Sequence, residues 1–348
     1  MGYPAPTETI FPQEAVDKLL QKAGIPKVDF WSPVRGGANN RVYFGVSGGN
    51  KMVLKIYFRD EGDKRDRLRG ELCFHSLAQK AGGNSVSRLL EWDLEYRLGL
   101  FDFVEGRKLK PGQISADHVR AAARLVACVN DALNVTGQEE DHPVASEACF
   151  SLAEHLDVVN RRVERLCYFE PRDNLDDEAV GWIKEELAPL WHQIRERAFA
   201  RAADESLDPV APLSQAQRWV SPSDFGFHNA LLDKAGDLKF FDFEYAGWDD
   251  PAKLIADFFC QPSVPVPINF WDVFVGELAQ CHQWYQEVGR RGRLLLPVYR
   301  IKWCCIILNE FLAADARRRN FSRNTDQDGR AAQLCKARSA LRKLLLEV

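Results

Sequence analysis

The 348-residue chain lacks a positive charge surplus, a paired-cysteine pattern and a long hydrophobic run. Its formal net charge of -4 gives no general affinity for nucleic acid. No apolar run reaches the roughly 18 residues that a membrane span needs. The opening residues, MGYPAPTETIFPQEAV, have no basic stretch followed by an apolar core, so they do not form a signal peptide. We therefore expect neither nucleic acid nor a membrane as a partner.

Cysteine is present but has no metal-binding or disulfide pattern. The nine cysteines are scattered and form no C-x-x-C pair. A disulfide framework or a zinc site is therefore not expected, and a reducing cytoplasm is the simplest location. Hydrophobic residues make up 46% and charged residues 28% of the chain, as in ordinary soluble proteins. The length suits one large domain or two modest ones with a real core.

The most informative stretch runs from Ser221 to Asp250. Short apolar runs at 231–232 and 238–243 are joined by a turn that contains Gly236, which predicts a β-hairpin. The turn would bring Asn229 and Asp242 to the same end of the two strands, and the preceding loop would carry Asp224 there as well. Oxygen ligands of this kind suit Mg²⁺, so the pattern predicts a magnesium site.

This stretch resembles the catalytic and metal-binding loops of the protein-kinase superfamily. The resemblance rests on D-x-x-x-x-N from Asp224 to Asn229, on Asp242 between apolar residues, and on the sequence DFEYAGWDDP that ends at Pro251. It is closest in character to the aminoglycoside phosphotransferase and choline kinase branch. The resemblance implies that ATP is the phosphoryl donor, that Asp224 accepts the proton of the acceptor hydroxyl, and that Asn229 and Asp242 hold Mg²⁺.

A lysine within an apolar strand gives a second match. Lys55 lies in the predicted strand 51–58, where an ammonium is costly unless it meets an anion, although an edge-strand lysine facing water is also common. Glu71 follows sixteen residues later in the predicted helix 63–80. The resemblance implies that Glu71 holds Lys55 against the α- and β-phosphates of ATP.

Two further segments acquire a role through the resemblance. A glycine-rich loop, with Gly36, Gly37 and Asn39, separates the predicted strands 28–34 and 41–46. Alone it would be an ordinary hairpin turn; the resemblance implies that it covers the phosphates. The predicted strand 96–103 leads into the implied hinge, with Phe101 as gatekeeper and also a core residue, and with backbone contacts to adenine from Asp102, Phe103 and Val104.

The resemblance covers about residues 28 to 260 and implies an α+β, protein kinase-like bilobal fold. Residues 1–103 would form a nucleotide-binding lobe, with a five-stranded antiparallel sheet and one helix. Residues 104–348 would form a larger, mostly helical lobe for catalysis and substrate binding. Helical periodicity in this second part predicts helices at 118–133, 150–168, 179–202, 254–259, 271–289, 293–319 and 331–348.

The implied activity is that of an ATP-dependent kinase acting on an alcohol group of a small molecule. One departure from the family stands beside Asp224: Pro222 and Ser223 occupy the positions where the family usually has His and Gly. His228 either substitutes as the residue that orients the loop or is a partly buried loop histidine. A nucleotide-binding pseudokinase without transferase activity is the alternative function.

Charge leaves the class of acceptor open. Residues 131–210 hold 19 acidic and 8 basic residues, whereas residues 251–348 hold 9 acidic and 15 basic ones. An acidic surface would suit a cationic acceptor, and solvated helix faces give the same surplus. An aminoglycoside, an amino alcohol, homoserine or a sugar would each fit.

Overall fold

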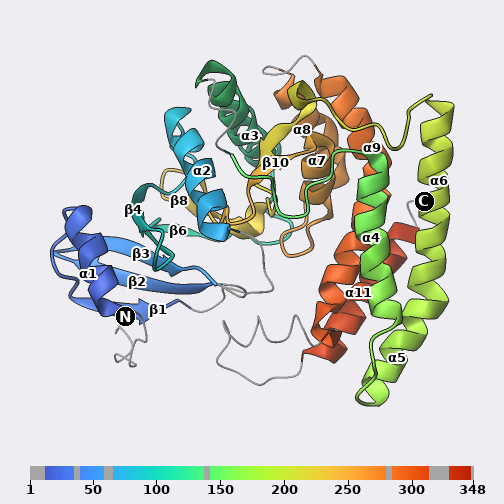
Figure 1. Ribbon diagram of the computed structural model, residues 1–348, viewed down its shortest axis with the longest axis horizontal. Coiled ribbons are helices and arrows are strands. Elements are labelled where there is room, and N and C mark those ends of the chain that lie inside the picture. Colours follow the sequence, from blue (N-terminus) through green and yellow to red (C-terminus); the bar gives the residue numbers. More distant parts are fainter. Residues whose placement is uncertain are drawn as a thin grey trace.

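The computed structural model describes residues 12–34, 40–58, 66–136, 142–279, 284–312 and 329–345. A five-stranded sheet lies at one end of the molecule and most of the helices lie at the other (Figure 1). This is the α+β arrangement that the sequence predicts.

The N-terminal sheet has the strand order β1-β2-β3-β5-β4, and every neighbouring pair is antiparallel. Its strands are β1 (Phe30–Pro33), β2 (Arg41–Ser47), β3 (Asn50–Ile56), β4 (Leu89–Asp93) and β5 (Leu98–Asp102). Helix α1 (Gln13–Lys22) buries Val16 and Leu19 in one cluster with Leu54 and Leu100 of the sheet. Met52 and Leu54 of β3 belong to this cluster together, because side chains two residues apart on a strand share a face.

Helix α2 (Arg67–Lys80) begins later than the predicted residue 63. Asp66 caps it, with its carboxylate accepting from the Arg69 N–H at 3.2 Å. Phe74 and Leu77 of α2 belong to the large core of the helical part rather than to the cluster under the sheet. The division between residues 103 and 104 stays a prediction.

The predicted hairpin forms, with β8 (Ala230–Asp233) paired to β9 (Leu238–Phe240). Asp233 Oδ1 accepts from the Ala235 and Asp237 amides, and Gly236 adopts a φ of +92°, which closes the turn. Strand β6 (Gly106–Arg107) adds to this sheet. A separate pair joins β7 (Trp219–Ser221) to β10 (Gly247–Asp249), so both flanks of the stretch from Ser221 to Asp250 are tied together.

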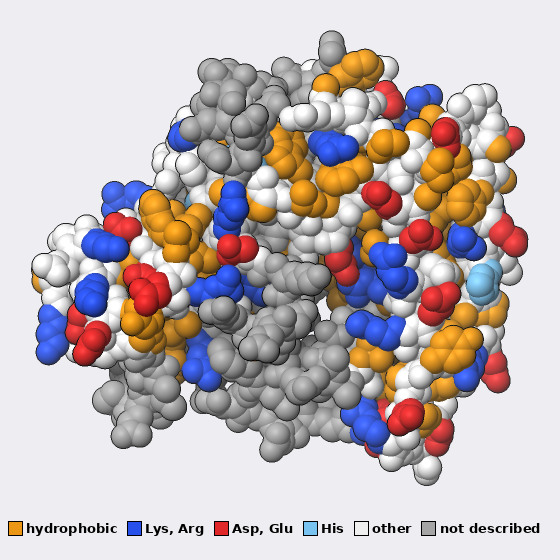
Figure 2. Space-filling view, in the orientation of Figure 1, with side chains coloured by type: hydrophobic (Ala, Val, Ile, Leu, Met, Phe, Trp, Pro, Cys, Tyr) orange, Lys and Arg blue, Asp and Glu red, His pale blue; other side chains and the backbone are white. Residues whose placement is uncertain are grey.

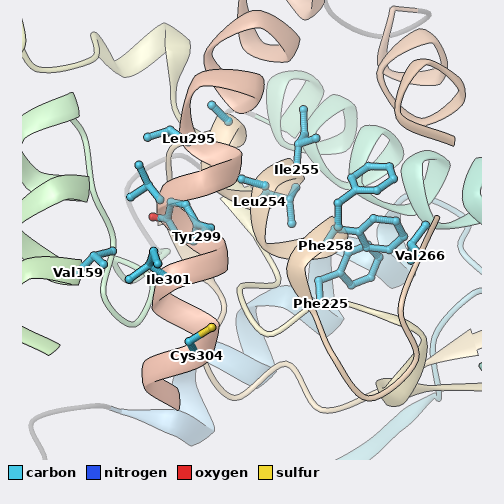
Figure 3. Close-up of a cluster of buried hydrophobic side chains, with 14 of the residues drawn as sticks. Val159, Phe225, Leu254, Ile255, Phe258, Val266, Leu295, Tyr299, Ile301 and Cys304 are labelled. Carbon is cyan, nitrogen blue, oxygen red and sulfur yellow. The ribbon is translucent and has the colours of Figure 1, made fainter. Parts of the chain in front are cut away.

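The second part of the chain is mostly helical, as expected. Its helices are α3 (Ala116–Thr136), α4 (Leu152–Cys167), α5 (Asn174–Trp182), α6 (Ala188–Asp204), α7 (Pro251–Cys260), α8 (Trp271–Leu278), α9 (Tyr285–Ile307) and α11 (Arg330–Leu345), with a π-helical turn at Ile183–Leu187. Figure 3 shows Phe225 of the loop after β7 beside Phe258 of α7, within the core that also receives Ile301 of α9. The loop after β7 is therefore anchored in the core of the helical part.

The boundaries predicted for helices 271–289 and 293–319 are wrong, because α8 ends at Leu278 and α9 runs from Tyr285 to Ile307. Gly289 does not end a helix, because α9 runs through it, through Gly292 and through Pro297. A Cβ at Gly289 would lie 2.8 Å from Val275 Cγ1, and one at Gly292 would lie 3.2 Å from the Trp271 ring. These glycines permit close packing of α8 on α9 rather than terminating α9.

No helix in the described part of the chain is long and apolar enough to cross a lipid bilayer. The eight cysteines within these residues are free thiols.

Candidate active site

The β8–β9 hairpin brings Asn229 and Asp242 together, as the sequence predicts. The Phe241 amide donates to the Asn229 carbonyl at 3.0 Å, so the residues that border the two strands face each other. Asp242 follows with a φ of +71°, in the left-handed region that is costly for a residue other than glycine. Such strain at a carboxylate between two loops is typical of a functional position.

The loop that carries Asp224 is anchored by two aromatic side chains that follow Asp224 in the sequence. Phe225 and Phe227 are buried, and their ring centroids lie 5.6 and 5.5 Å from that of Phe258. Asp224 lies between Ser223 and Phe225 with 38% of its side chain exposed. Ser223 has a φ of +66°, which explains why glycine suits this position. The loop therefore forms without the His and Gly that the resemblance leads one to expect.

The amide of Asn229 is oriented by the Asp224 backbone. Asn229 Nδ2 donates to the Asp224 carbonyl at 3.1 Å, which leaves the amide oxygen as the atom available to a ligand. No group of three His, Cys, Asp or Glu residues within the described ranges could hold a metal ion unaided. One amide oxygen and the Asp242 carboxylate suit Mg²⁺, which is bound by few protein oxygens and keeps waters and phosphate oxygens as its other ligands. The residues present therefore fit that ion.

Lys55 is buried and lies between two carboxylates. Its Nζ is 2.6 Å from Glu71 Oε2 and also contacts Asp242 Oδ1 directly. Tyr57, two residues after Lys55 and just beyond the end of β3, donates its hydroxyl proton to Glu71 Oε2 at 2.6 Å. The predicted pairing of Lys55 with Glu71 is present in the structure. Nothing in the sequence motifs singles out Tyr57, although the alternation of the predicted strand 51–58 places it on the same face as Lys55.

Burial and charge act against each other in this cluster. Burial would lower the pKa of Lys55, but Asp242 and then Glu71 raise it above its ordinary value. Burial would raise the pKa of Glu71, yet Lys55 and then His75 lower it to about 2. Desolvation raises the pKa of Asp242, Lys55 opposes that rise, and the carboxylates of Glu244 and Glu71 add to it. A charged Lys55 thus faces more carboxylate charge than it can neutralise, which favours the binding of a further cation.

A second buried contact, which no sequence motif reveals, joins α2, the residue before β2 and the loop after Asp242. Glu244 Oε2 accepts from Asn40 Nδ2 at 2.7 Å, and Arg67 Nη1 lies 3.3 Å from Glu244 Oε1. All three side chains are buried. A Cβ at Gly70 would lie 3.0 Å from the Ala246 carbonyl oxygen, so only glycine lets α2 approach this loop so closely. The helix that carries Glu71 is therefore positioned by the loop that carries Asp242.

Two of the three backbone amides in the predicted hinge already donate hydrogen bonds within the protein. Phe101 is buried, with its ring centroid 5.1 Å from that of His75. The Asp102 amide donates to the Arg88 carbonyl at 2.9 Å, and the Phe103 amide donates to the Lys51 carbonyl at 3.3 Å. The Val104 amide has no hydrogen-bond partner within the part of the chain that the structure describes. Of the three predicted backbone donors, Val104 is thus the one left for a ligand.

The remaining predicted site residues, Gly36, Gly37 and Asn39, lie outside the described residues. Asn40 follows them directly and is described: its Oδ1 accepts from the Phe58 amide at 3.1 Å.

Acidic residues of the stretch 131–210 form ion pairs with basic residues of the stretch 251–348. Arg330 of α11 lies 2.6 Å from Asp173 and 2.5 Å from Asp176, and Arg338 lies 2.6 Å from Glu178. Acidic and basic side chains are also interspersed over the face in Figure 2. Part of the acidic surplus therefore serves the packing of α5 on α11, and it is not an argument for a cationic acceptor.

The geometry defines a kinase-like protein, and comparison with known proteins identifies its family. Residues 31–295 match the model of the phosphotransferase enzyme family. The chain belongs to this family. No sequence among curated proteins matches it.

Solved structures of similar fold include kinases of several small molecules. A spectinomycin phosphotransferase in complex with ADP and spectinomycin is 10% identical, with a TM-score of 0.56 over 96% of this chain and 100% of that one. A choline kinase from Cryptosporidium parvum Iowa II is 12% identical, with a TM-score of 0.58 over 96% of this chain and 97% of that one. A macrolide 2'-phosphotransferase from Brachybacterium faecium is 19% identical, with a TM-score of 0.52 over 94% of this chain and 97% of that one. At these identities the likeness establishes the kinase-like fold.

Proposed function

We propose that the protein transfers the γ-phosphoryl group of ATP to a hydroxyl group of a small molecule. The observation that carries the proposal is the contact of Lys55 with both Glu71 and Asp242, beside the loop that carries Asp224 and Asn229. These residues come from four separate segments of the chain. Each segment holds the residue type that phosphoryl transfer needs at that place.

In this proposal Lys55, held by Glu71 and Tyr57, binds the α- and β-phosphates. Asn229 and Asp242 would hold Mg²⁺, which when bound neutralises charge that develops on the transferred group. Lys55, which contacts the carboxylates of Glu71 and Asp242, would share Asp242 with Mg²⁺ when the nucleotide is bound. Gly36 and Gly37 would cover the phosphates, and the hinge after Phe101 would contact adenine, chiefly through the Val104 amide.

Asp224 would orient the acceptor hydroxyl and accept its proton. Its carboxylate is partly exposed and extends from a rigid loop, as a base that meets an incoming substrate must. Chemistry of this type depends mostly on positioning and on charge stabilisation, so a displacement of about 1 Å at Asp224 would lower the rate strongly. An amino alcohol, an aminoglycoside, homoserine or a sugar would each fit this site as the acceptor. The proposed location of the protein is the cytoplasm.

The test is thermal unfolding with and without Mg·ATP, followed by a screen of acceptors. At about a hundred times its dissociation constant, a ligand adds roughly 2.7 kcal/mol to stability, which shifts the midpoint visibly. The wild type should show a shift that requires Mg²⁺, Asp242→Ala should lose it, and Asp224→Asn should keep it. Wild type alone should then release ADP with an acceptor. Binding with no turnover for any acceptor would favour the alternative, a nucleotide-binding pseudokinase.

A further inference from the structure

A histidine ring lies against the proposed catalytic carboxylate. His228 Nε2 is 3.2 Å from Asp224 Oδ1, and the two side chains belong to the same loop, four residues apart. Only 18% of the His228 side chain is exposed, compared with 38% for Asp224. The residue two positions before Asp224, Pro222, is buried and has no side-chain donor. A donor to Asp224 from within its own loop can thus come from the C-terminal side, where His228 lies.

The ring occupies a space that glycine provides. A Cβ at Gly226 would lie 3.0 Å from His228 Nδ1, 3.3 Å from its Cε1 and 3.5 Å from Gln261 Cγ. Gln261 is itself buried and accepts from the Val264 amide at 3.0 Å, so it cannot easily withdraw. A side chain at residue 226 would therefore press on the His228 ring, because Gln261 leaves it little room on its other side.

The free nitrogen of the ring indicates where its proton lies. His228 Nδ1 is buried and has no hydrogen-bond partner within the described ranges of the chain. A proton on Nδ1 would therefore be a buried donor without an acceptor, which is costly. The favoured tautomer carries its proton on Nε2, the nitrogen that faces Asp224.

We propose that His228 is a positioning residue that holds Asp224 by donating its Nε2–H to Oδ1, which leaves Oδ2 for the acceptor hydroxyl. The inference rests on the proposed transfer reaction. Catalytic hydrogen bonds are often loose without substrate and tighten once it binds, so the 3.2 Å contact corresponds to the resting state. Because Nδ1 has no partner, the ring cannot pass a proton onward, and its role is orientation alone.

Two substitutions at this position separate donation from packing. In His228→Gln the terminal amide nitrogen can occupy the place of Nε2, whereas in His228→Asn the shorter side chain places its amide near Nδ1 and cannot reach Asp224. Gly226→Ala keeps the histidine and displaces the ring. His192→Asn changes an exposed histidine on α6 and serves as the control.

The first readout is steady-state hydrolysis of Mg·ATP, with water as the acceptor. We expect His228→Asn and Gly226→Ala to lower kcat about 100-fold with KM for ATP unchanged, the size of loss that a displacement of about 1 Å causes. His228→Gln should recover most of kcat, and His192→Asn should match the wild type. Equal losses in His228→Gln and His228→Asn at equal melting temperatures, or no loss in His228→Asn, would overturn the proposal.

The second readout does not depend on turnover. Two-bond ¹H–¹⁵N correlation spectra of the imidazole rings, with the His228 signal assigned by its absence in His228→Gln, report which nitrogen is protonated. We expect a proton on Nε2 in the wild type and a changed Nε2 resonance in Asp224→Ala. A proton on Nδ1 alone, or no response to Asp224→Ala, would refute the pair. If the spectra are as expected but the protein binds Mg·ATP without hydrolysing it, the His228–Asp224 contact is supported and the transfer reaction is refuted. Failure of the contact and failure of the reaction therefore give different results.

Discussion

Asn40 Nδ2 donates a 2.7 Å hydrogen bond to Glu244 Oε2 across 204 positions of the sequence. Through its Oδ1, the same amide accepts from the Phe58 amide at the end of β3 at 3.1 Å. Asn40 thus links the N-terminal sheet to the loop that follows Asp242. Arg67 lies on the other side of Glu244, so α2 takes part in the same contact.

We expect Asn40→Ala to destabilise the protein and to weaken nucleotide binding. It removes two buried hydrogen bonds, each worth about 1 kcal/mol, and leaves the Phe58 amide and part of Glu244 without their partners. The predicted loss is about 2 kcal/mol in the free energy of unfolding, measured by urea denaturation, with weaker Mg·ATP binding by calorimetry. Asn174→Ala, at an exposed position on α5, is the control and should change neither quantity. Unchanged stability in Asn40→Ala would show that the Asn40–Glu244 contact does not stabilise the packing of the N-terminal sheet on the loop after Asp242.

Lys55 should contribute to the stability of the free protein as well as to nucleotide binding. In Lys55→Met, Glu71 and Asp242 lose their common ammonium, and Glu71 is almost completely buried. Removing one partner of such a pair costs about 3 kcal/mol. Because Tyr57 can still donate to an amide oxygen, the double variant Lys55→Met, Glu71→Gln should be more stable than Lys55→Met alone. Urea denaturation of both single variants and the double variant measures this coupling.

The double variant separates stability from function. It should regain part of the free energy of unfolding and still show no Mg-dependent shift with ATP, because the phosphate-binding ammonium is absent. Full nucleotide binding in the Lys55→Met variants would remove Lys55 from the proposed nucleotide site.

Local patterns in the sequence were sufficient to predict several of these features. The hairpin that joins Asn229 to Asp242 follows from two apolar runs and a glycine turn. Lys55 stands out through its place in an apolar strand together with the resemblance that pairs it with Glu71. Tyr57 could have been found by the same strand alternation. The contact of Asn40 with Glu244 could not, because its partners are 204 residues apart and each is an ordinary polar residue in its own segment.

Glycine was the least reliable of the local signals. Gly289 and Gly292 were expected in or near a helix end, but tertiary packing of α8 overrides their low helix propensity. At Ser223 the reverse holds: the backbone has the conformation that favours glycine, and the sequence places a serine there. Such positions are decided by neighbours that are distant in sequence, so no local pattern reveals them.

Ser223→Gly should therefore stabilise the protein. The φ of +66° at Ser223 costs a residue with a Cβ about 1 kcal/mol, which glycine avoids. Ser206, just after α6, has a φ of +54° and provides a matched control far from Asp224. Ser206→Gly should raise the melting temperature by a similar amount without affecting turnover. A lower melting temperature in Ser223→Gly would mean that the Ser223 side chain makes a contribution that exceeds the strain.

His155, a buried histidine of α4 that contacts the start of α7, should make the stability of the protein depend on pH. His155 Nδ1 is 2.7 Å from the Tyr299 hydroxyl, and Nε2 is 3.1 Å from Asp250 Oδ2. Burial alone would lower the pKa of His155, but Cys149 and the Asp250 carboxylate raise it to about 9. In the unfolded chain the pKa is about 6.5.

Because the folded pKa is the higher one, the contribution of His155 to stability is fully present below about pH 6.5 and is lost as the pH rises through about 9. The whole change is on the order of 3 kcal/mol. Urea denaturation at pH 6, 7, 8 and 9 should show the wild type losing stability over this range. His155→Gln, which keeps hydrogen-bonding capacity but cannot titrate, should show a much flatter dependence, whereas His192→Gln, on the exposed face of α6, should follow the wild type. Parallel curves for the wild type and His155→Gln would mean that folding leaves the pKa of His155 at its unfolded value, and that Asp250 is balanced instead by Arg291, which also contacts it.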